Sequence, residues 1–563
     1  MKNKIIDLVH ANVEGLSRDA IASLIEIPPK SELGDFAFPC FSLAKTMRKA
    51  PQIIAQELCD AIGTVDDIDE IKVQGAYLNF YINKDTFVKS MVESASAEDF
   101  GSSDVGAGQT ICIDYSSPNV AKNFHVGHLR TTIIGNSLYK IFSKLGYKVV
   151  RINHLGDWGT QFGKLIVAYK AWGNEEAVKK DGVAELMRLY VRFHDEAEKN
   201  PSLNDEARAW FTKMEHGDEE ALRIWQWFKD ISLIEYKRTY ELLGVDFDYY
   251  LGESFYCDKT EDVVKRLTSA NLLSESQGAK IVDLEAYDMA PCLILKNDGS
   301  SIYATRDLAA IFYRKETYNF SKCLYVTGQE QKLHFAQVFK VVELLGNDWA
   351  KDQLVHIPYG LVSLEGAKLS TRNGNVIYAE DILLEAISKI REIIEEKNPN
   401  IPDKDETAKK IGVGAVLFND LYNQRIKDVS FKWEKLLNFD GETGPYVQYT
   451  YARCASILRK IDDFDPSAPI DYSQITNPEA MDLLKEITRF PKVILDASEK
   501  YEPSVIARFA VDVAQSFNKF YNACRINVED TSTRNARVML VYLTKKTIKD
   551  ALLLLGIECP EQM

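Results

Sequence analysis

The feature that most constrains this chain is a predicted strand that leads into a helix through two histidines. Residues 116–136 read SSPNVAKNFHVGHLRTTIIGN. The run at 109–115 before them alternates as a strand does, and apolar residues recur at helical spacing from Leu129. His125 and His128 therefore flank the first turn of a predicted helix. Unpaired backbone N–H groups and the helix dipole make such a turn favourable for a phosphate group.

The residues at this turn suit chemistry at a nucleotide phosphate. Gly127 has no Cβ, so a base or a ribose could approach the backbone closely. The two imidazoles could donate hydrogen bonds as charge builds up during displacement at an α-phosphate. For an isolated HxxH pair, a purely structural role is the better interpretation. Here the Pro118–Asn119 turn, Lys122 and the change from strand to helix favour phosphate binding.

No metal site is predicted. Two histidines could begin a zinc site, but neither an HExxH motif nor clustered cysteines supply further ligands. The nine cysteines are scattered, and four in apolar surroundings are predicted to be reduced core residues: Cys40, Cys292, Cys323 and Cys454.

Length and hydropathy indicate a multidomain cytoplasmic protein. A chain of 563 residues should contain about three or four domains. No apolar run approaches the roughly 18 residues that a membrane span needs, and the N-terminus resembles an amphipathic helix rather than a signal peptide. A net charge of −15 makes a nucleic-acid partner less expected, although a local basic track could still bind one.

The order of predicted elements indicates a multidomain α/β protein. Strands at 148–153, 323–327 and 354–358 alternate with helices, as in a Rossmann-like parallel sheet. Charged helices interrupt this pattern, and we interpret them as an insertion where ligands gather at strand ends. The predicted parts are an α+β domain at 1–107, the parallel-sheet domain at 108–377 with an insertion at about 164–287, a helical connector at 378–440, and an all-α helical bundle at 441–563.

A second candidate phosphate-binding segment is EGAKLSTRNGN at 365–375. Gly366 and Gly374 suit a mobile loop, and Lys368 with Arg372 could close over a polyphosphate. Taken alone, a solvated basic loop is the better interpretation. Together with the HVGH turn on the other half of the sheet, the loop is predicted to close over a polyphosphate.

Several ordered motifs resemble those of the class I aminoacyl-tRNA synthetases, and among them the arginyl-tRNA synthetases. HVGH stands where the class has its HIGH signature. The resemblance extends over nearly the whole chain and also rests on RINHLGDWGTQFG at 151–163, YATRD at 303–307, QKLHFAQ at 331–337, GPYVQYTYAR at 444–453, ELGDFAFPCFSLAK at 32–45 and the C-terminal LLLLGIECPEQM.

The resemblance implies that arginine and ATP form arginyl-adenylate and pyrophosphate, and that the arginyl group then passes to the terminal ribose of its tRNA. ATP would carry Mg²⁺, with no tightly bound cofactor. The implied catalytic residues are His125, His128, Lys122 and Lys368, and the implied ATP-binding residues are His125, Gly127, His128, Lys368 and Ser370.

Arginine recognition is implied for Ser117, Asn119, His128, Asn153, Tyr303, Asp307 and Gln331. A buried carboxylate such as Asp307 pairs with a guanidinium in a geometry that an ammonium cannot match, so lysine should be rejected. Judged without the motif, Asp307 would be a helix cap or structural ion pair and Tyr303 a core aromatic.

Contacts with tRNA are also implied. The residues implied to contact an anticodon base are Tyr446, Arg453, Tyr521 and Met563. As bare sequence, the tyrosines near 446–451 could simply pack between helices. In the N-terminal domain, Tyr77 and Phe80 are candidate contacts for the outer corner of the tRNA, or else core strand residues.

One position departs from the class pattern. Many class I enzymes have a KMSKS loop whose second lysine contacts pyrophosphate, and here KLSTR places Thr371 there. We hypothesise that Lys122, just before the HVGH signature, supplies the missing charge; the alternative is an exposed lysine without a role.

Two other classes of protein remain as alternatives, a different HxGH nucleotidyltransferase and a non-catalytic RNA-binding relative. The RINHLGDWG and YATRD motifs argue against the first, and nearly intact site motifs argue against the second. The absence of coiled-coil heptads leads us to expect a monomer.

Overall fold

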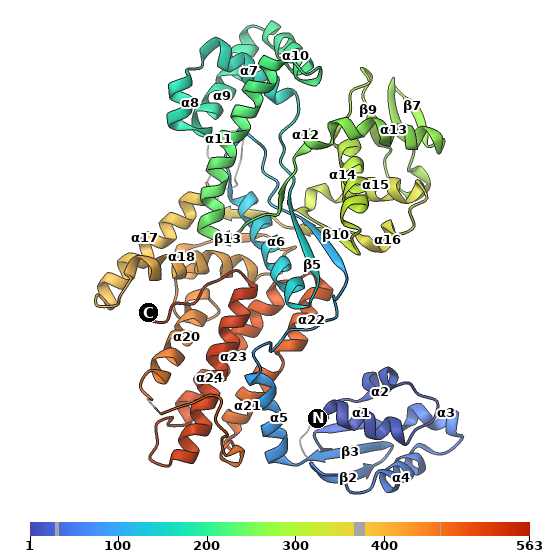
Figure 1. Cartoon of the computed structure of the whole chain (residues 1–563), viewed down its shortest axis with the longest axis vertical. Coiled ribbons are helices and arrows are strands. Elements are labelled where there is room, and N and C mark those ends of the chain that lie inside the picture. Colours follow the sequence, from blue (N-terminus) through green and yellow to red (C-terminus); the bar gives the residue numbers. More distant parts are fainter. Residues whose placement is uncertain (29–32, 365–377, 462) are drawn as a thin grey trace. The chain divides into compact units, whose positions relative to one another are not determined.

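The computed structural model describes residues 1–28, 33–364, 378–461 and 463–563 (Figure 1). The chain divides into two compact units. The first unit comprises residues 1–100, 457–489 and 515–544, and the second comprises residues 101–456, 490–514 and 545–563.

The N-terminal part of the first unit is a small antiparallel sheet with helices. Its strands pair in the order β1-β3-β2. Leu78 and Phe80 of β3 are fully buried with Ile5 and Val9 of the amphipathic first helix. Phe80 is thus a core residue, and only Tyr77, in edge contact with Phe41, is partly exposed. The elements are α1 (Lys2–Ala11), α2 (Arg18–Leu24), β1 (Phe36–Pro39), α3 (Ala44–Met47), α4 (Pro51–Ile62), β2 (Ile68–Gln74), β3 (Tyr77–Ile82) and α5 (Lys84–Ser96).

The second unit is built on a five-stranded parallel sheet, which confirms the predicted fold class. The strands lie in the order β11-β10-β4-β5-β6. The chain runs outward from β4 to one edge and later returns on the other side through β10. The direction in which strands are added therefore reverses between β4 and β10. The carboxyl ends of these two strands form a topological switch point, where such sheets bind ligands. The strands are β4 (Thr110–Asp114), β5 (Lys148–Asn153), β6 (Tyr249–Tyr250), β10 (Lys322–Gly328) and β11 (Leu354–Tyr359).

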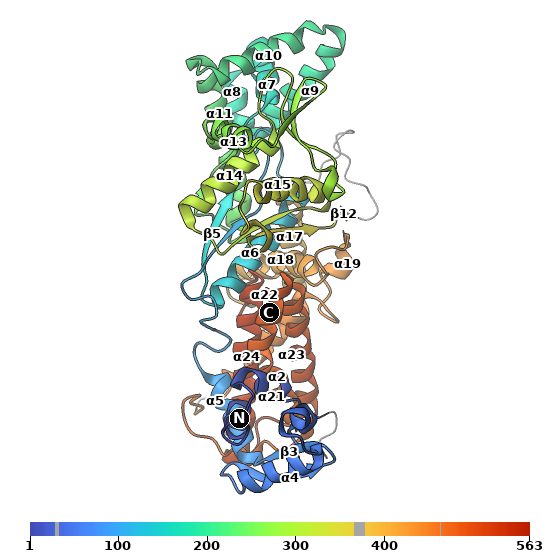
Figure 2. The same ribbon diagram turned by 90° about the vertical axis from the view of Figure 1, so that its right-hand side faces the viewer.

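Helices pack around this sheet. Helix α6, which begins within the HVGH turn, contacts β4, β5 and β10. Another core joins the sheet to α14 and α15 through residues such as Ile152, Leu308 and Val338. Figure 2 shows α6 beside α17 and α18. These helices are α6 (Val126–Lys144), α14 (Tyr303–Tyr318), α15 (Lys332–Leu344), α17 (Ala379–Lys397) and α18 (Lys404–Leu421).

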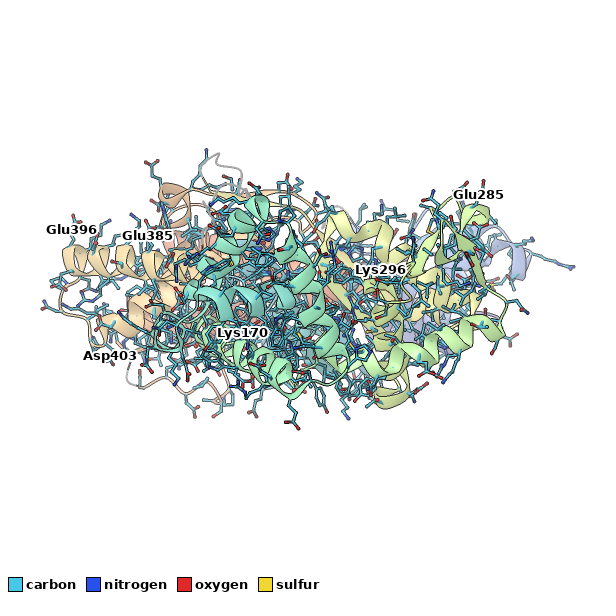
Figure 3. All side chains as sticks on the ribbon, turned by 90° about the horizontal axis from the view of Figure 1, so that it is seen from above. Lys170, Glu285, Lys296, Glu385, Glu396 and Asp403 are labelled. Atoms are coloured by element: carbon cyan, nitrogen blue, oxygen red, sulfur yellow. The ribbon has the colours of Figure 1, made fainter. Side chains whose placement is uncertain are left out.

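A cluster of helices follows β5, inside the predicted insertion. Viewed from above, Lys170 of this cluster lies between Glu396 and Asp403 near α17 and α18 on one side and Glu285 on the other (Figure 3). The cluster consists of α7 (Thr160–Trp172), α8 (Glu175–Asp181), α9 (Val183–Lys199), α10 (Ser202–Glu215) and α11 (Glu219–Leu243).

The range 164–287 and the residues directly after it also hold elements that the sequence did not indicate. Strand β6 returns to the main sheet and pairs with β5. It has only two residues, too short to show alternation. A separate antiparallel sheet comes next and also contributes to the core of α14. These elements are α12 (Glu253–Tyr256), α13 (Thr260–Ser269), β7 (Leu273–Ser276), β8 (Ala279–Val282) and β9 (Cys292–Leu295).

The rest of the chain is mostly helical, as predicted for its C-terminal part. The four cysteines predicted to lie in the core are buried and free.

In the described part of the chain, no helix has both the length and the apolar character needed to cross a membrane. The remaining elements are α16 (Ala350–Gln353), β12 (Val362–Leu364), β13 (Val429–Phe431), α19 (Trp433–Leu436), α20 (Gly444–Leu458), α21 (Pro478–Thr488), α22 (Phe490–Lys500), α23 (Ser504–Ala523) and α24 (Thr531–Leu554).

Candidate active site

The HVGH turn is held together by its own histidines. His125 is the N-cap of α6, and its Nδ1 accepts the backbone N–H of Gly127 at 3.1 Å. In return, Nδ1 of His128 accepts the backbone N–H of His125 at 3.2 Å. Because both Nδ1 atoms act as acceptors, each neutral ring carries its proton on Nε2. The turn therefore provides two Nε2–H donors at the start of a helix.

Gly127 is needed by the turn itself. A Cβ at this position would lie 2.9 Å from Cε1 of His125, closer than side-chain carbons approach one another. The His125 ring thus lies directly over the glycine. Sequence reasoning assigned this space to a nucleotide; the structure adds that the capping histidine already requires it.

Burial, aided by nearby charge, favours the neutral form of both imidazoles. Burial lowers the pKa of His125, and the nearby charge of Lys122 lowers it further. Burial also places the pKa of His128 well below its usual range, with added effects from His125 and Lys122. The pKa of Lys122 is itself lowered by burial. The charge of Lys122 therefore acts on both histidines of the turn.

Aromatic contacts link this cluster to the end of β5. The ring of Phe124 lies 5.3 Å from His128 and 5.5 Å from Tyr240 of α11, between ring centroids. The Tyr240 hydroxyl accepts a hydrogen bond from Nδ2 of Asn153 at 2.9 Å. Asn153 is fully buried, and its Oδ1 has no hydrogen-bond partner among the described residues. That oxygen is an available acceptor at the carboxyl end of the sheet.

A polar network links β4 to the helices α14 and α15. Ser117 donates from its hydroxyl to Asp114 at 2.9 Å, and the buried Arg314 guanidinium lies 2.8 Å from the same carboxylate. Arg314 also donates to Nδ1 of His154 at 3.2 Å. His154 Nε2 lies 4.0 Å from Asp307. The structure thus brings together Ser117 and Asp307, two residues predicted to bind arginine.

Asp307 has a second carboxylate near it. Its Oδ2 lies 2.6 Å from Nε2 of His334. Glu253, at the start of α12, is buried and pairs with Arg306 at 2.8 Å. Burial raises the pKa of Glu253 to about 8, and the charge of Asp307 also favours the protonated form. Sequence reasoning missed Glu253, because the two-residue strand before it gives no signal that a strand ends there.

The other predicted residues differ in how well the structure places them. Tyr303 begins α14 and is 60% exposed, and the Arg306 guanidinium lies 5.1 Å from its ring. Asn119, in the connection from β4 to α6, and Gln331, directly before α15, are exposed. Lys368, Ser370 and Thr371 lie outside the described residues. Their predicted roles stay predictions.

Three of the four residues predicted to bind the anticodon belong to the second unit. Arg453 lies over Tyr449 with its guanidinium 4.9 Å from the ring centroid. Together with Met563, these residues line a cavity of about 520 Å³. Tyr446 is on the same helix α20. Tyr521 belongs to the first unit, on α23, where its ring stacks on Phe517.

Comparison with protein families gives three matches in chain order. Residues 2–82 match the family described as arginyl tRNA synthetase N terminal domain. Residues 92–433 match the tRNA synthetases class I (R) catalytic domain, and residues 447–563 match the DALR anticodon binding domain.

Individual relatives match over the whole length. The chain is 54% identical to an arginine–tRNA ligase of Alkaliphilus metalliredigens over 564 residues, covering 100% of this chain and 99% of the relative. It is 53% identical to that of Clostridioides difficile with the same coverage. The solved structure of Thermus thermophilus arginyl-tRNA synthetase superimposes with a TM-score of 0.79 at 27% identity, covering 96% of each chain.

Proposed function

The chain belongs to the arginyl-tRNA synthetases of class I, and on that premise we propose how its own residues charge tRNA with arginine. Its activity is that of an arginine–tRNA ligase. In the first step, the arginine carboxylate attacks the α-phosphate of ATP and pyrophosphate leaves. In the second step, the terminal ribose of tRNA takes the arginyl group and AMP leaves. The observation that carries the proposal is the pair of Nε2–H donors fixed by the HVGH turn at the switch point of the sheet.

ATP would bind with its phosphates against the start of α6. Nε2–H groups of His125 and His128 would donate to phosphate oxygens, where preorganised donors are most effective as charge develops. Lys122 adds a positive charge beside them. In this proposal Lys122 replaces the lysine that the loop lacks at Thr371, while Lys368 and Ser370 act from the loop.

Magnesium would enter with the nucleotide. The described residues contain no group of three or more His, Cys, Asp or Glu side chains that could hold a metal ion. The phosphates of ATP would therefore be its main ligands, and their charge needs such neutralisation.

Arginine would bind with its guanidinium between Asp307 and Glu253. The buried carboxylate of Glu253 and the partly buried one of Asp307 match the forked donors of a guanidinium, whereas the point charge of lysine cannot bridge them with the same geometry. The pairing of Glu253 with the protein's own Arg306 supports this, since it shows that the carboxylate can accept a guanidinium. The Oδ1 of Asn153, which has no hydrogen-bond partner in the described part of the chain, and the hydroxyl of Ser117 would help to orient the substrate.

The tRNA would contact the C-terminal helices. The cavity beside Arg453 and Met563 has an aromatic face and a cation, a combination suited to a splayed base. Tyr446, Tyr521 and the exposed Asn119 and Gln331 keep the roles that the family resemblance implies. We further propose a cytoplasmic monomer.

The test is attachment of labelled arginine to total tRNA with ATP and magnesium, beside lysine and citrulline. Citrulline is a good competitor because it has nearly the shape of arginine but no charge. Pyrophosphate exchange with and without tRNA would show whether activation depends on tRNA. Charging with arginine alone supports the proposed pocket, whereas charging with citrulline at a similar rate contradicts the role given to Asp307 and Glu253.

A further inference from the structure

A fully buried carboxylate holds the segment that carries Glu253. Asp157 lies just beyond β5 and has no exposed surface. Its Oδ1 accepts the backbone N–H of Ser254 at 2.8 Å, and its Oδ2 accepts the Ser254 hydroxyl at 2.7 Å. The backbone N–H of Glu253 is bonded to the carbonyl of Leu155 at 3.0 Å. The first turn of α12 is therefore fixed from the loop that follows β5.

The charge on Asp157 is balanced from the helical insertion. Lys229 of α11 places its Nζ 2.6 Å from Oδ2 of Asp157, and its side chain is only 15% exposed. Trp225, one turn earlier on the same helix, donates from Nε1 to the Asp157 carbonyl at 2.7 Å and lies under the Lys229 ammonium. One helix thus holds both the carboxylate and the backbone of Asp157.

The packing leaves little freedom at this point. A Cβ on Gly252, the residue before Glu253, would lie 2.4 Å from the Asp157 carboxylate. Glycine thus lets the backbone come so close that Asp157 reaches the N–H of Ser254. Glu253 itself is turned to the Arg306 guanidinium, beside Asp307.

We propose that Asp157 and Lys229 are a positioning pair that sets the place of Glu253 for the guanidinium of substrate arginine. The helical insertion would then contribute to amino-acid selection without touching the substrate. This inference rests on the function proposed above, specifically on the role of Glu253. A buried ion pair is seldom worth more stability than apolar residues in its place, so a role in geometry is a physical reason for this one.

Steady-state kinetics on the full-length enzyme can separate positioning from general stability. Lys229→Gln leaves a buried carboxylate without its cation, and Asp157→Asn leaves a buried cation without its carboxylate. The double variant D157N/K229Q is neutral and can still hydrogen-bond to Ser254. The matched control is Lys170→Gln, since Lys170 pairs with Glu220 at 2.5 Å between α7 and α11, but on the exposed side of the insertion (Figure 3).

We expect each single variant to raise KM for arginine about tenfold or more, and to change KM for ATP less than twofold. A tenfold change corresponds to about 1.4 kcal/mol of binding. The double variant should recover most of the arginine affinity, and Lys170→Gln should match the wild type. Thermal unfolding of all four variants, followed by circular dichroism, shows which of them fold.

Two results would overturn the inference. One is an equal rise of KM for arginine and ATP in the folded single variants, which indicates a general loss of structure. The other is a double variant no better than the singles, which means that charge balance around Asp157 does not matter. If instead the wild-type enzyme does not attach arginine to tRNA, the proposed function itself is wrong. Failure of the proposed function can therefore be distinguished from failure of the positioning role.

Discussion

The imidazole rings of His125 and His128 are stacked, with centroids 3.8 Å apart and an angle of 22° between their planes. Each ring uses Nδ1 to accept a backbone N–H of the same turn. In each ring, one nitrogen therefore has a structural role and the other is available for a chemical role. One nitrogen builds the turn, and the other is left to donate to a ligand.

This division can be tested at His125 with two matched substitutions. In His125→Asn, the amide oxygen can replace Nδ1 as the cap, but the Nε2–H donor is lost. We expect its stability to stay near the wild type and adenylate formation to fall about 10²–10³-fold, as for the loss of one preorganised donor. In His125→Gln, the donor is roughly kept and the cap is lost, which should cost about 1 kcal/mol of stability. Pyrophosphate exchange and urea unfolding measure both; equal behaviour of the two variants would contradict the division.

Lys122→Ala tests the hypothesis about the missing loop lysine. Removing a cation beside the phosphates should lower the rate of adenylate formation by about tenfold to a hundredfold, with little change in KM for arginine. Lys368→Ala, assayed in parallel, shows the contribution of the loop. Near-normal exchange activity of Lys122→Ala would refute the hypothesis.

The raised pKa of Glu253 predicts that arginine affinity depends on pH. With a pKa of about 8, this carboxyl is mostly protonated at pH 7 and mostly ionised at pH 9. A cationic guanidinium binds the ionised form, so arginine affinity should increase about tenfold over that range and then level off. Calorimetric titration with arginine at several pH values, with tRNA present, measures this affinity. Glu253→Gln should bind arginine weakly with no such increase; a wild-type affinity independent of pH would speak against the role of Glu253.

Arg130 and Asp420 form a buried pair behind the turn, and we expect it to matter for stability. The guanidinium donates to the carbonyls of Gly360, Leu361, Arg425 and Lys427, and its Nε lies 3.3 Å from Asp420. Arg130→Met should lower the free energy of unfolding by about 3–5 kcal/mol, because it leaves a carboxylate and several carbonyls unpaired. The free energy of unfolding, from urea melts, measures this loss.

The pH dependence of that loss has a definite sign. Burial raises the pKa of Asp420 to about 6 even with Arg130 present. Without the arginine the folded-state pKa rises further, so the folded variant holds a proton that the unfolded chain releases. Its stability should therefore decrease as pH rises from 5 to 8, beyond any change in the wild type. In the double variant R130M/D420N this extra dependence should disappear; a loss of stability equal at both pH values would exclude a buried charge as its cause.

Arg453→Ala tests the cavity in the C-terminal helices. The loss of its cation over Tyr449 should weaken tRNA binding, raising KM for tRNA about tenfold and leaving KM for ATP and arginine unchanged. Lys545→Ala is the control, because Lys545 lies over the ring of Tyr451 but does not line the cavity. Equal effects of the two variants would indicate a general electrostatic contribution rather than a base pocket.

Much of the fold was readable from the sequence because its signals are local. Strands β5 and β11 and the start of α6 fall close to the predicted residues, since alternation and helical spacing extend over several residues there. Strand β6 was not predicted, because two residues carry no period. The helical C-terminal part could also be predicted, because apolar residues recur there at helical spacing over long segments.

The sequence alone was enough to predict the HVGH turn and the class of reaction, and it supplied the predictions for the residues that would bind arginine and ATP. A turn of four residues carries its own hydrogen bonds, and ordered motifs identify a family without coordinates. The partners of Glu253, Asp157 and Arg130 could be identified from the folded chain alone. Lys229 and Asp420, as sequence, look like any charged residue of a helix. Their burial and pairing depend on segments far along the chain, and only the packing of the fold brings those charges together.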